Sequence, residues 1–527
     1  PSTVELAQNA DGTYGVKSAK VYYAAIGETK YDTLADAIAA AKDGDTITLL
    51  ANCEAERVNL EDKSLKVVLN GYTLESTSDY GVMFCAKNGN TITIDGTVEG
   101  SKLVGTLMVT NGTDGHIAIS GGTYENSKYC PIYINGAVST DNSTLTVKGA
   151  TIIANGTDSD QDAGCAVYLA GYCTSSFTDT TITAPVTGIE IRAGKLTLKN
   201  CTVAGGSGEV TTSANGNGTT VKNAALAISQ HTTKKPIDVT ITGGKYTATA
   251  ALYQTDVQGT GSAGVNATVN SGKFNGTVSA ETNNTIAVKG GTFSNAVPEN
   301  CCADGYVPTQ STEGSYGVEY KPIEVWTGYS GTKVASYKTI AEAAANLGEN
   351  KWIIVAKDYT LTENFSFADG IYLDVVNGAT LTVAEGVTIT VEADAKRLGV
   401  RDGAALVNNG TIVVCGSSTK NGFAMLYGTF SGNALTVPEG CFLDNNGSNY
   451  FATANADALY EITFGDGTVK KTADSTNIKG GNVTQIKLLG NVTKGGWTID
   501  NASVGPETVL DLNVYTISYS GANPYYA

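Results

Sequence analysis

A short motif of strand, bend and strand recurs along the chain and limits the possible folds more than any other feature. Each copy alternates apolar and polar residues, bends at one or two small residues and ends on an apolar or aromatic residue. Alternation with a period of two is typical of β-strands, and a bend that recurs once per copy is what the stacked coils of a solenoid require. The copies are Ile117–Tyr124, Leu145–Ile152, Leu196–Val203, Val239–Tyr246, Ala267–Phe274 and Ile286–Phe293.

This pattern favours parallel stacking over an antiparallel sandwich, which would need tight turns between consecutive strands. The intervals between copies fit one coil plus insertions of varying length. We therefore predict an all-β fold of right-handed parallel β-helix modules in tandem, that is, pectin-lyase-like solenoids. Repeated Asn-Gly pairs such as Asn70-Gly71 and Asn377-Gly378 leave hairpins open as an alternative for some loops.

A longer repeat divides the chain into modules. The segment Tyr31–Ile38 and its following strands recur from Tyr337, and part of the pattern appears again from Thr484. Similar segments at Asp11–Val16 and Glu313–Val318 indicate module ends. We predict the tail of a preceding module in 1–19, a large module in 20–320, a smaller one in 321–455 and the start of a truncated third module in 456–527.

Each of the two complete modules is expected to open with a short helix. Thr33 is a suitable N-cap, with Asp36 three residues later and apolar residues at helical spacing beyond it. Thr339 and Glu342 repeat this arrangement. The sequence thus predicts capping helices near 33–42 and 339–347, each covering the open end of a stacked sheet.

Charge and hydropathy argue against two classes of partner. The formal net charge of −17 would repel a nucleic acid. No run of 18 or more apolar residues occurs, so no membrane insertion is expected in this segment. At 41% hydrophobic residues, the chain is too apolar to stay disordered.

The ten cysteines lack the C-x-x-C spacing of a zinc site. Cys165 and Cys173, eight positions apart around a possible turn, are the best disulfide candidates. Six further cysteines are expected to be small buried hydrophobic residues: Cys53, Cys85, Cys130, Cys201, Cys415 and Cys441.

Some parallel β-helices cleave polysaccharides, which makes an enzyme one possible function. A glycosidase needs two carboxylates across the scissile bond, but no Asp-Asp pair lies on a strand. Glu190 and Arg192 share one face of a strand and are most simply a surface charge pair if that face is exposed. His116 and His231 suggest no Ser/His/Asp arrangement. We predict no catalytic residue.

One acidic segment suits a metal ion. Asp158, Asp160 and Asp162 alternate in a loop, and converging carboxylates are typical calcium ligands. The Glu expected at the twelfth position of such a loop is absent, because Leu169 stands there. A structural calcium site and a solvated acidic loop are both open; no other cofactor is expected.

Tyrosine is abundant, with 27 residues, and several copies lie near strand ends or loops. Exposed tyrosine among Asn, Ser and Thr suits recognition of sugars or protein surfaces, because it combines apolar area with a hydroxyl group. The candidate binding residues are Tyr168, Tyr172, Tyr246 and Tyr253, although a role in the core is the alternative.

The segment Tyr31–Ala41 with Asp43–Ile47, and the segment Gly290–Ser294 leading to Asp304–Pro308, resemble large repetitive surface proteins of gut Gram-positive anaerobes. That resemblance implies an adhesin-like bacterial protein, secreted or on the cell surface, and some similar proteins bind immunoglobulin. We expect a non-catalytic module that recognises a host glycan or a host protein such as mucin or immunoglobulin. A polysaccharide lyase or glycoside hydrolase, and a structural stalk, are the alternatives, and the smaller module suits a spacer.

Overall fold

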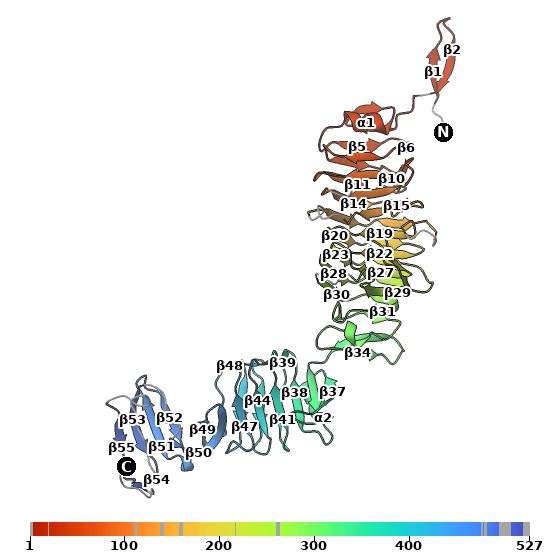
Figure 1. Ribbon diagram of the computed structural model, residues 1–527. Coiled ribbons are helices and arrows are strands. Elements are labelled where there is room, and N and C mark those ends of the chain that lie inside the picture. Colours follow the sequence, from red (N-terminus) through yellow and green to blue (C-terminus); the bar gives the residue numbers. More distant parts are fainter. Residues whose placement is uncertain are drawn as a thin grey trace. The chain divides into compact units, whose positions relative to one another are not determined.

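The computed structural model describes residues 4–18, 20–109, 113–136, 142–157, 162–216, 218–259, 264–475, 478, 482–494 and 507–519. The chain divides into two compact units, 1–319 and 320–527. Short β-strands dominate both units, and within each of them strands from successive coils stack side by side (Figure 1).

The first unit is a parallel β-solenoid, as the repeated motif predicted. Each full coil passes through three columns of strands, and every column pairs in parallel with the coil before and the coil after. The first column consists of β5 (Thr46–Leu49), β8 (Leu65–Val68), β11 (Thr91–Gly96), β14 (His116–Gly121), β17 (Thr144–Lys148), β20 (Thr174–Thr178), β23 (Gly194–Lys199), β28 (Ile237–Thr242), β30 (Val265–Val269) and β32 (Ile286–Val288).

The other two columns belong to one 19-stranded sheet, because β29 and β31 run through both of them. The second column consists of β6 (Cys53–Ala55), β9 (Thr73–Ser76), β12 (Lys102–Val104), β15 (Thr123–Asn126), β18 (Thr151–Ala154), β21 (Thr181–Thr183), β24 (Thr202–Ala204), β29 (Lys245–Thr255), β31 (Lys273–Ala280) and β33 (Thr292–Phe293). The third adds β7 (Val58–Leu60), β10 (Val82–Ala86), β13 (Thr106–Val109), β16 (Ile132–Ile134), β19 (Cys165–Leu169), β22 (Thr187–Ile191) and β27 (Ala224–Ser229).

Asn70 and Gly71 form a corner of the coil, not a hairpin. Both have left-handed backbone angles, with φ of 53° and 84°, which Asn and Gly tolerate best. The strands on either side, β8 and β9, belong to different sheets and do not pair with each other. The hairpin alternative is therefore wrong at this Asn-Gly pair.

Inward-facing residues stack along the solenoid axis. The aromatic residues that end three copies of the motif, Tyr246, Phe274 and Phe293, are buried, with ring centroids 4.9 and 4.8 Å apart and planes nearly parallel. Stacked rings of this kind add specific contacts to the hydrophobic core.

The first unit is closed at both ends by antiparallel pairing. At the start, β3 (Ala24–Ile26) pairs antiparallel with β4 (Thr29–Tyr31) and with β5. Helix α1 (Leu34–Ala40) begins after Thr33, whose Oγ1 accepts a hydrogen bond from the Asp36 N–H at 3.0 Å. At the far end, β33 pairs antiparallel with β35 (Tyr316–Tyr320), which follows β34 (Tyr306–Gln310).

The second unit repeats this architecture with fewer coils. Helix α2 (Ile340–Ala345) follows Thr339, which caps it through the Glu342 N–H at 3.0 Å. An eight-stranded sheet forms one face of these coils. In spatial order it contains β37 (Lys333–Tyr337), β36 (Ile323–Trp326), β38 (Trp352–Val355), β41 (Tyr372–Val375), β44 (Arg397–Val400), β47 (Phe423–Leu426), β50 (Asn449–Ala454) and β49 (Cys441–Asn446).

Two smaller parallel sheets complete these coils around a separate core. They contain β39 (Tyr359–Leu361), β42 (Thr380–Val383), β45 (Ala405–Asn408) and β48 (Thr429–Gly432), and β40 (Phe365–Phe367), β43 (Thr388–Val391) and β46 (Thr411–Val414).

The same opening arrangement occurs a third time near the end of the described chain. The strand β51 (Tyr460–Phe464) pairs antiparallel with β52 (Val469–Thr472) and β53 (Val483–Leu488), and β53 then pairs in parallel with β55 (Val509–Asp511). This order matches β3, β4, β5 and β8 in the first unit, and β36, β37, β38 and β41 in the second. A third small core lies beneath these strands.

The two cysteines that were the best disulfide candidates belong to different hydrophobic clusters. Cys173 packs into the main core, whereas Cys165 belongs to an outer cluster with Cys130 and Tyr133. Both are free thiols in this structure, so these two best candidates for a disulfide are not paired in it. Within the described residues, no helix is long and apolar enough to cross a membrane.

Candidate functional site

A cleft of about 830 Å³ opens on the outer face of the eight-stranded sheet of the second unit. Glu324, Ile354 and Asp374 occupy equivalent outward positions on three neighbouring strands and line it. Four residues that directly follow β38, β41, β44 and β47 form a second line along it: Ala356, Val376, Arg401 and Tyr427. The cleft is therefore assembled from equivalent positions on successive coils.

Asp374 is the electrostatic centre of the cleft. Its side chain is buried, and it accepts a hydrogen bond from Trp352 Nε1 at 2.7 Å. Arg397 donates to both of its carboxylate oxygens at 3.0 Å, and Arg401 Nη2 donates at 2.8 Å. A Cβ atom at Gly399, the next position across the sheet, would overlap Asp374 Oδ1, so the glycine makes room for the carboxylate.

The same network holds a pair of stacked aromatic rings next to the cleft. The rings of Trp352 and Tyr372 stack with centroids 3.8 Å apart and an angle of 3°. The Arg397 guanidinium lies 5.0 Å from the Tyr372 centroid, within cation–π range. These groups cover one another's faces, and Trp352 and Tyr372 do not themselves line the cleft.

Two other tyrosines have rings available to a ligand. Tyr329 is 66% exposed and Tyr427 is 58% exposed, and both line the cleft. The guanidinium of Arg401 lies 4.5 Å from the Tyr329 centroid, so the Asp374 network also holds this tyrosine in place.

The side of the cleft near β36 carries a second carboxylate. Glu324 Oε2 accepts a hydrogen bond from Trp326 Nε1 at 2.7 Å, and Lys333 Nζ lies 3.6 Å from Glu324 Oε1. Asp374 and Glu324 both accept hydrogen bonds from neighbouring side chains. They therefore hold Trp352, Arg397 and Arg401, and Trp326, in place.

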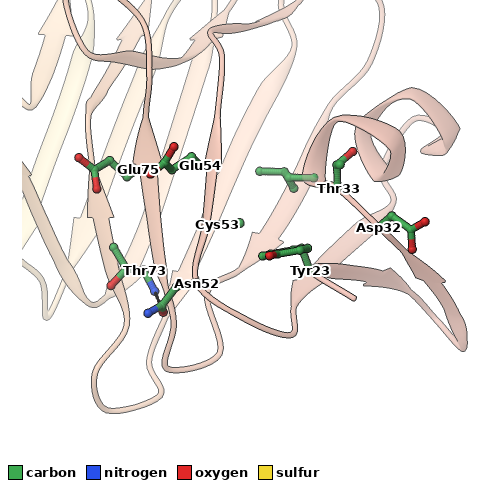
Figure 2. A pocket seen from close by; sticks show the side chains of 9 residues that line it. Tyr23, Asp32, Thr33, Asn52, Cys53, Glu54, Thr73 and Glu75 are labelled. Atoms are coloured by element: carbon green, nitrogen blue, oxygen red, sulfur yellow. Dashed lines mark hydrogen bonds between the residues drawn. The ribbon is translucent and has the colours of Figure 1, made fainter. Parts of the chain in front are cut away.

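A smaller cleft of about 520 Å³ lies beside α1 in the first unit. Figure 2 shows Tyr23 and Thr33 on its helix side and Cys53 between them and the strands, with Glu54 and Glu75 side by side. Glu54 and Glu75 are direct partners on β6 and β9, and both are exposed. Burial raises the pKa of the Cys53 thiol to about 11, so this thiol is not a ready nucleophile.

The four tyrosines predicted as binding residues do not gather in one place. Tyr168 stacks on Tyr133 with centroids 4.7 Å apart in an outer cluster, whereas Tyr246 lies in the main core. Both are fully buried, so neither ring offers a surface to a ligand.

Tyr172 and Tyr253 are only partly buried. Tyr172 lies under Lys235 Nζ, which is 5.7 Å from its ring centroid. Tyr253 donates its hydroxyl to Glu281 at 2.7 Å, and desolvation followed by this contact raises its pKa to about 12.

Glu190 and Arg192 are not a surface pair, because both are fully buried. Asn215 and residues 218–221 cover them. Glu190 accepts hydrogen bonds from the N–H groups of Thr220 and Val221, and Arg192 donates to the carbonyl of Gly218 at 2.6 Å. Burial raises the pKa of Glu190, and these contacts partly oppose that rise. A substrate could not reach either side chain in this structure.

His231 belongs to the same covered region. Its Nε2 lies 3.1 Å from the carbonyl oxygen of Gly216, which requires an N–H at that nitrogen. Burial, and then the charge of Arg192, lower the pKa of His231 to about 4. His116, in contrast, contacts Thr144 Oγ1 at 2.9 Å on the exposed side of the first strand column.

The calcium prediction stays a prediction. Asp158 and Asp160 lie outside the described residues, and the Asp162 carboxylate accepts hydrogen bonds from Thr219 N and Oγ1 at 2.8 and 3.0 Å. Across the described ranges, no group of three His, Cys, Asp or Glu residues could hold a metal ion.

The sequence does contain a signal for the aromatic and cationic cluster around Asp374, although none of the cleft residues was among the predicted sites. Aligning the strands of the smaller module gives Trp352–Val355, Tyr372–Val375 and Arg397–Val400, each with an aromatic or cationic residue at the first outward position. Comparing outward positions in register brings Trp352, Tyr372 and Arg397 together.

Comparison with protein-family models, with curated proteins and with solved structures finds no match to this chain.

Proposed function

We propose that the chain is a non-catalytic carbohydrate-binding module, which takes a host glycan in the cleft of the second unit. The observation that carries this proposal is the pair of exposed rings, Tyr329 and Tyr427, beside a cleft whose wall is locked by a buried carboxylate. Aromatic faces pack against the C–H groups of a sugar, while nearby polar groups reach its hydroxyls.

The dimensions and rigidity of the cleft support this proposal. A volume of about 830 Å³ is in the range of small-molecule sites. Because Asp374 fixes Arg401, and Arg401 packs on Tyr329, little ordering remains to be done when a ligand binds.

We further propose that this module belongs to an adhesin-like bacterial protein, secreted or on the cell surface, built from tandem right-handed pectin-lyase-like coils. Strand connections between parallel strands of one sheet are almost always right-handed, which supports the handedness. The resemblance in the capping segments, such as Tyr31–Ala41, supports the setting. A host protein such as mucin or immunoglobulin is the second kind of partner we propose for the loops of the first unit.

The test is binding of the whole chain to an array of host glycans, mucins and immunoglobulins. We expect saturable glycan binding that Tyr427→Ala weakens at least tenfold, since the exposed ring would supply much of the contact. Tyr14→Ala is the matched control, because Tyr14 is 68% exposed and lies outside the cleft. Glycan binding that survives both Tyr427→Ala and Tyr329→Ala would refute the location.

A further inference from the structure

We infer that the sugar bound in this cleft carries an acetamido group, as a neutral 2-acetamido hexose does. This inference rests on the proposed carbohydrate function and specifies its ligand class. It follows from an apolar floor beneath the tyrosines, combined with a balanced set of charges.

The floor of the cleft is made of aliphatic side chains. Ile354, Ala356 and Val376 line it on neighbouring coils, and Ile354 is 9% exposed. A plain hexose presents hydroxyl groups around its ring and would leave them facing this floor without hydrogen-bond partners, which is costly. An acetamido methyl group can instead pack against these three side chains.

The polar groups near the floor suit the rest of an acetamido group. Asn377 follows Val376 directly and lines the same cleft, and Asp402 does so next to Arg401. An amide side chain can donate to the acetamido carbonyl and accept from its N–H, and a carboxylate can accept from the N–H or from hydroxyls. Both residues are exposed and therefore available to a ligand.

The charges in and around the cleft balance, which favours a neutral sugar over an acidic or amino sugar. Glu324, Asp374 and Asp402 supply three negative charges. Against them stand Arg401, Arg397 on Asp374, and Lys333 on Glu324. A ligand carboxylate or ammonium group would therefore meet no net attraction.

The experiment measures the affinity of the whole chain for four methyl glycosides, those of N-acetylglucosamine, N-acetylgalactosamine, glucose and glucosamine, by titration calorimetry or ligand-observed NMR. We expect at least one acetamido sugar to bind roughly tenfold tighter than glucose and glucosamine, since one methyl group in an apolar pocket gives a discrimination of about that size.

Val376→Thr keeps the shape of the floor and adds a hydroxyl group, so it should reduce the ratio of the affinity for the acetamido sugar to the affinity for glucose. Val334→Thr is the matched control, because Val334 is 52% exposed and does not line the cleft. Its preference should equal that of the unchanged protein.

The outcomes separate the two proposals. Equal affinity for glucose and the acetamido sugars, lost in Tyr427→Ala, would overturn the acetamido inference and leave the carbohydrate site standing. A preference that Val376→Thr does not alter would also overturn it. Binding of none of these sugars, nor of any glycan on the array, would overturn both.

Discussion

Replacing Asp374 with Asn should destabilise the second unit and weaken its cleft at the same time. Two arginines and one indole N–H converge on this buried carboxylate. The amide removes the negative charge and turns one acceptor into a donor that faces other donors. Removing one partner of a buried ion pair typically costs about 3–5 kcal/mol. Arg397 and Arg401 keep side-chain exposures of 16% and 21%, so the lower end of about 3 kcal/mol applies.

For a unit of this size, a loss of about 3 kcal/mol lowers the melting temperature by roughly 6–12 °C. Differential scanning calorimetry of the whole chain measures it, because the two units have separate cores and should give separable transitions. Only the transition of the second unit should move. Asp402→Asn, an exposed carboxylate in the same cleft, is the control and should move neither transition by more than about 2 °C. A loss below about 1 kcal/mol in Asp374→Asn would show that the network is not a stability element.

Three further predictions concern the first unit. Phe274→Ala should lower its free energy of unfolding by about 3–5 kcal/mol in urea denaturation, because the ring is sandwiched between two others in the core. His231 has a pKa of about 4 in the folded state against about 6.5 when unfolded, so the unfolded state takes up a proton first as pH falls. As the pH falls from about 6.5 to 4, protonation of His231 in the unfolded state therefore lowers the free energy of unfolding by up to about 3 kcal/mol. His231→Gln should remove this part of the pH dependence. If the free energy of unfolding of the two proteins changed with pH in parallel, the lowered pKa of His231 would be contradicted. If residues 158–162 bind calcium, millimolar calcium should raise the melting temperature of the unchanged protein but not of Asp160→Asn.

Much of the fold could be predicted because the geometry of a solenoid is encoded in local patterns. Alternation, small residues at bends and the Thr33 and Thr339 caps all act within a few residues of each other. The burial of Tyr246 could have been predicted as well. It ends its motif copy at the position that Phe274 and Phe293 occupy in later copies, which is an inward position.

The cleft could not be found in this way, because its contacts join residues from different coils. Asp374 meets partners 22, 23 and 27 residues away, and the number of residues per coil has to be known before these positions align. The same holds for Glu190 and Arg192. Local alternation correctly placed them on one outward face, but that face is buried by contacts with Asn215 and residues 218–221, which lie far along the chain.

The antiparallel strands at the ends of the first unit hinder polymerisation of the chain. A stack of parallel coils is a template at both ends, and an open end could recruit another copy of itself, as in a growing fibril. The reversed strands β3 and β35 interrupt the parallel pairing at the two ends, and α1 packs beside the first coil. The ends of this stack therefore disfavour its extension by a coil from a neighbouring molecule.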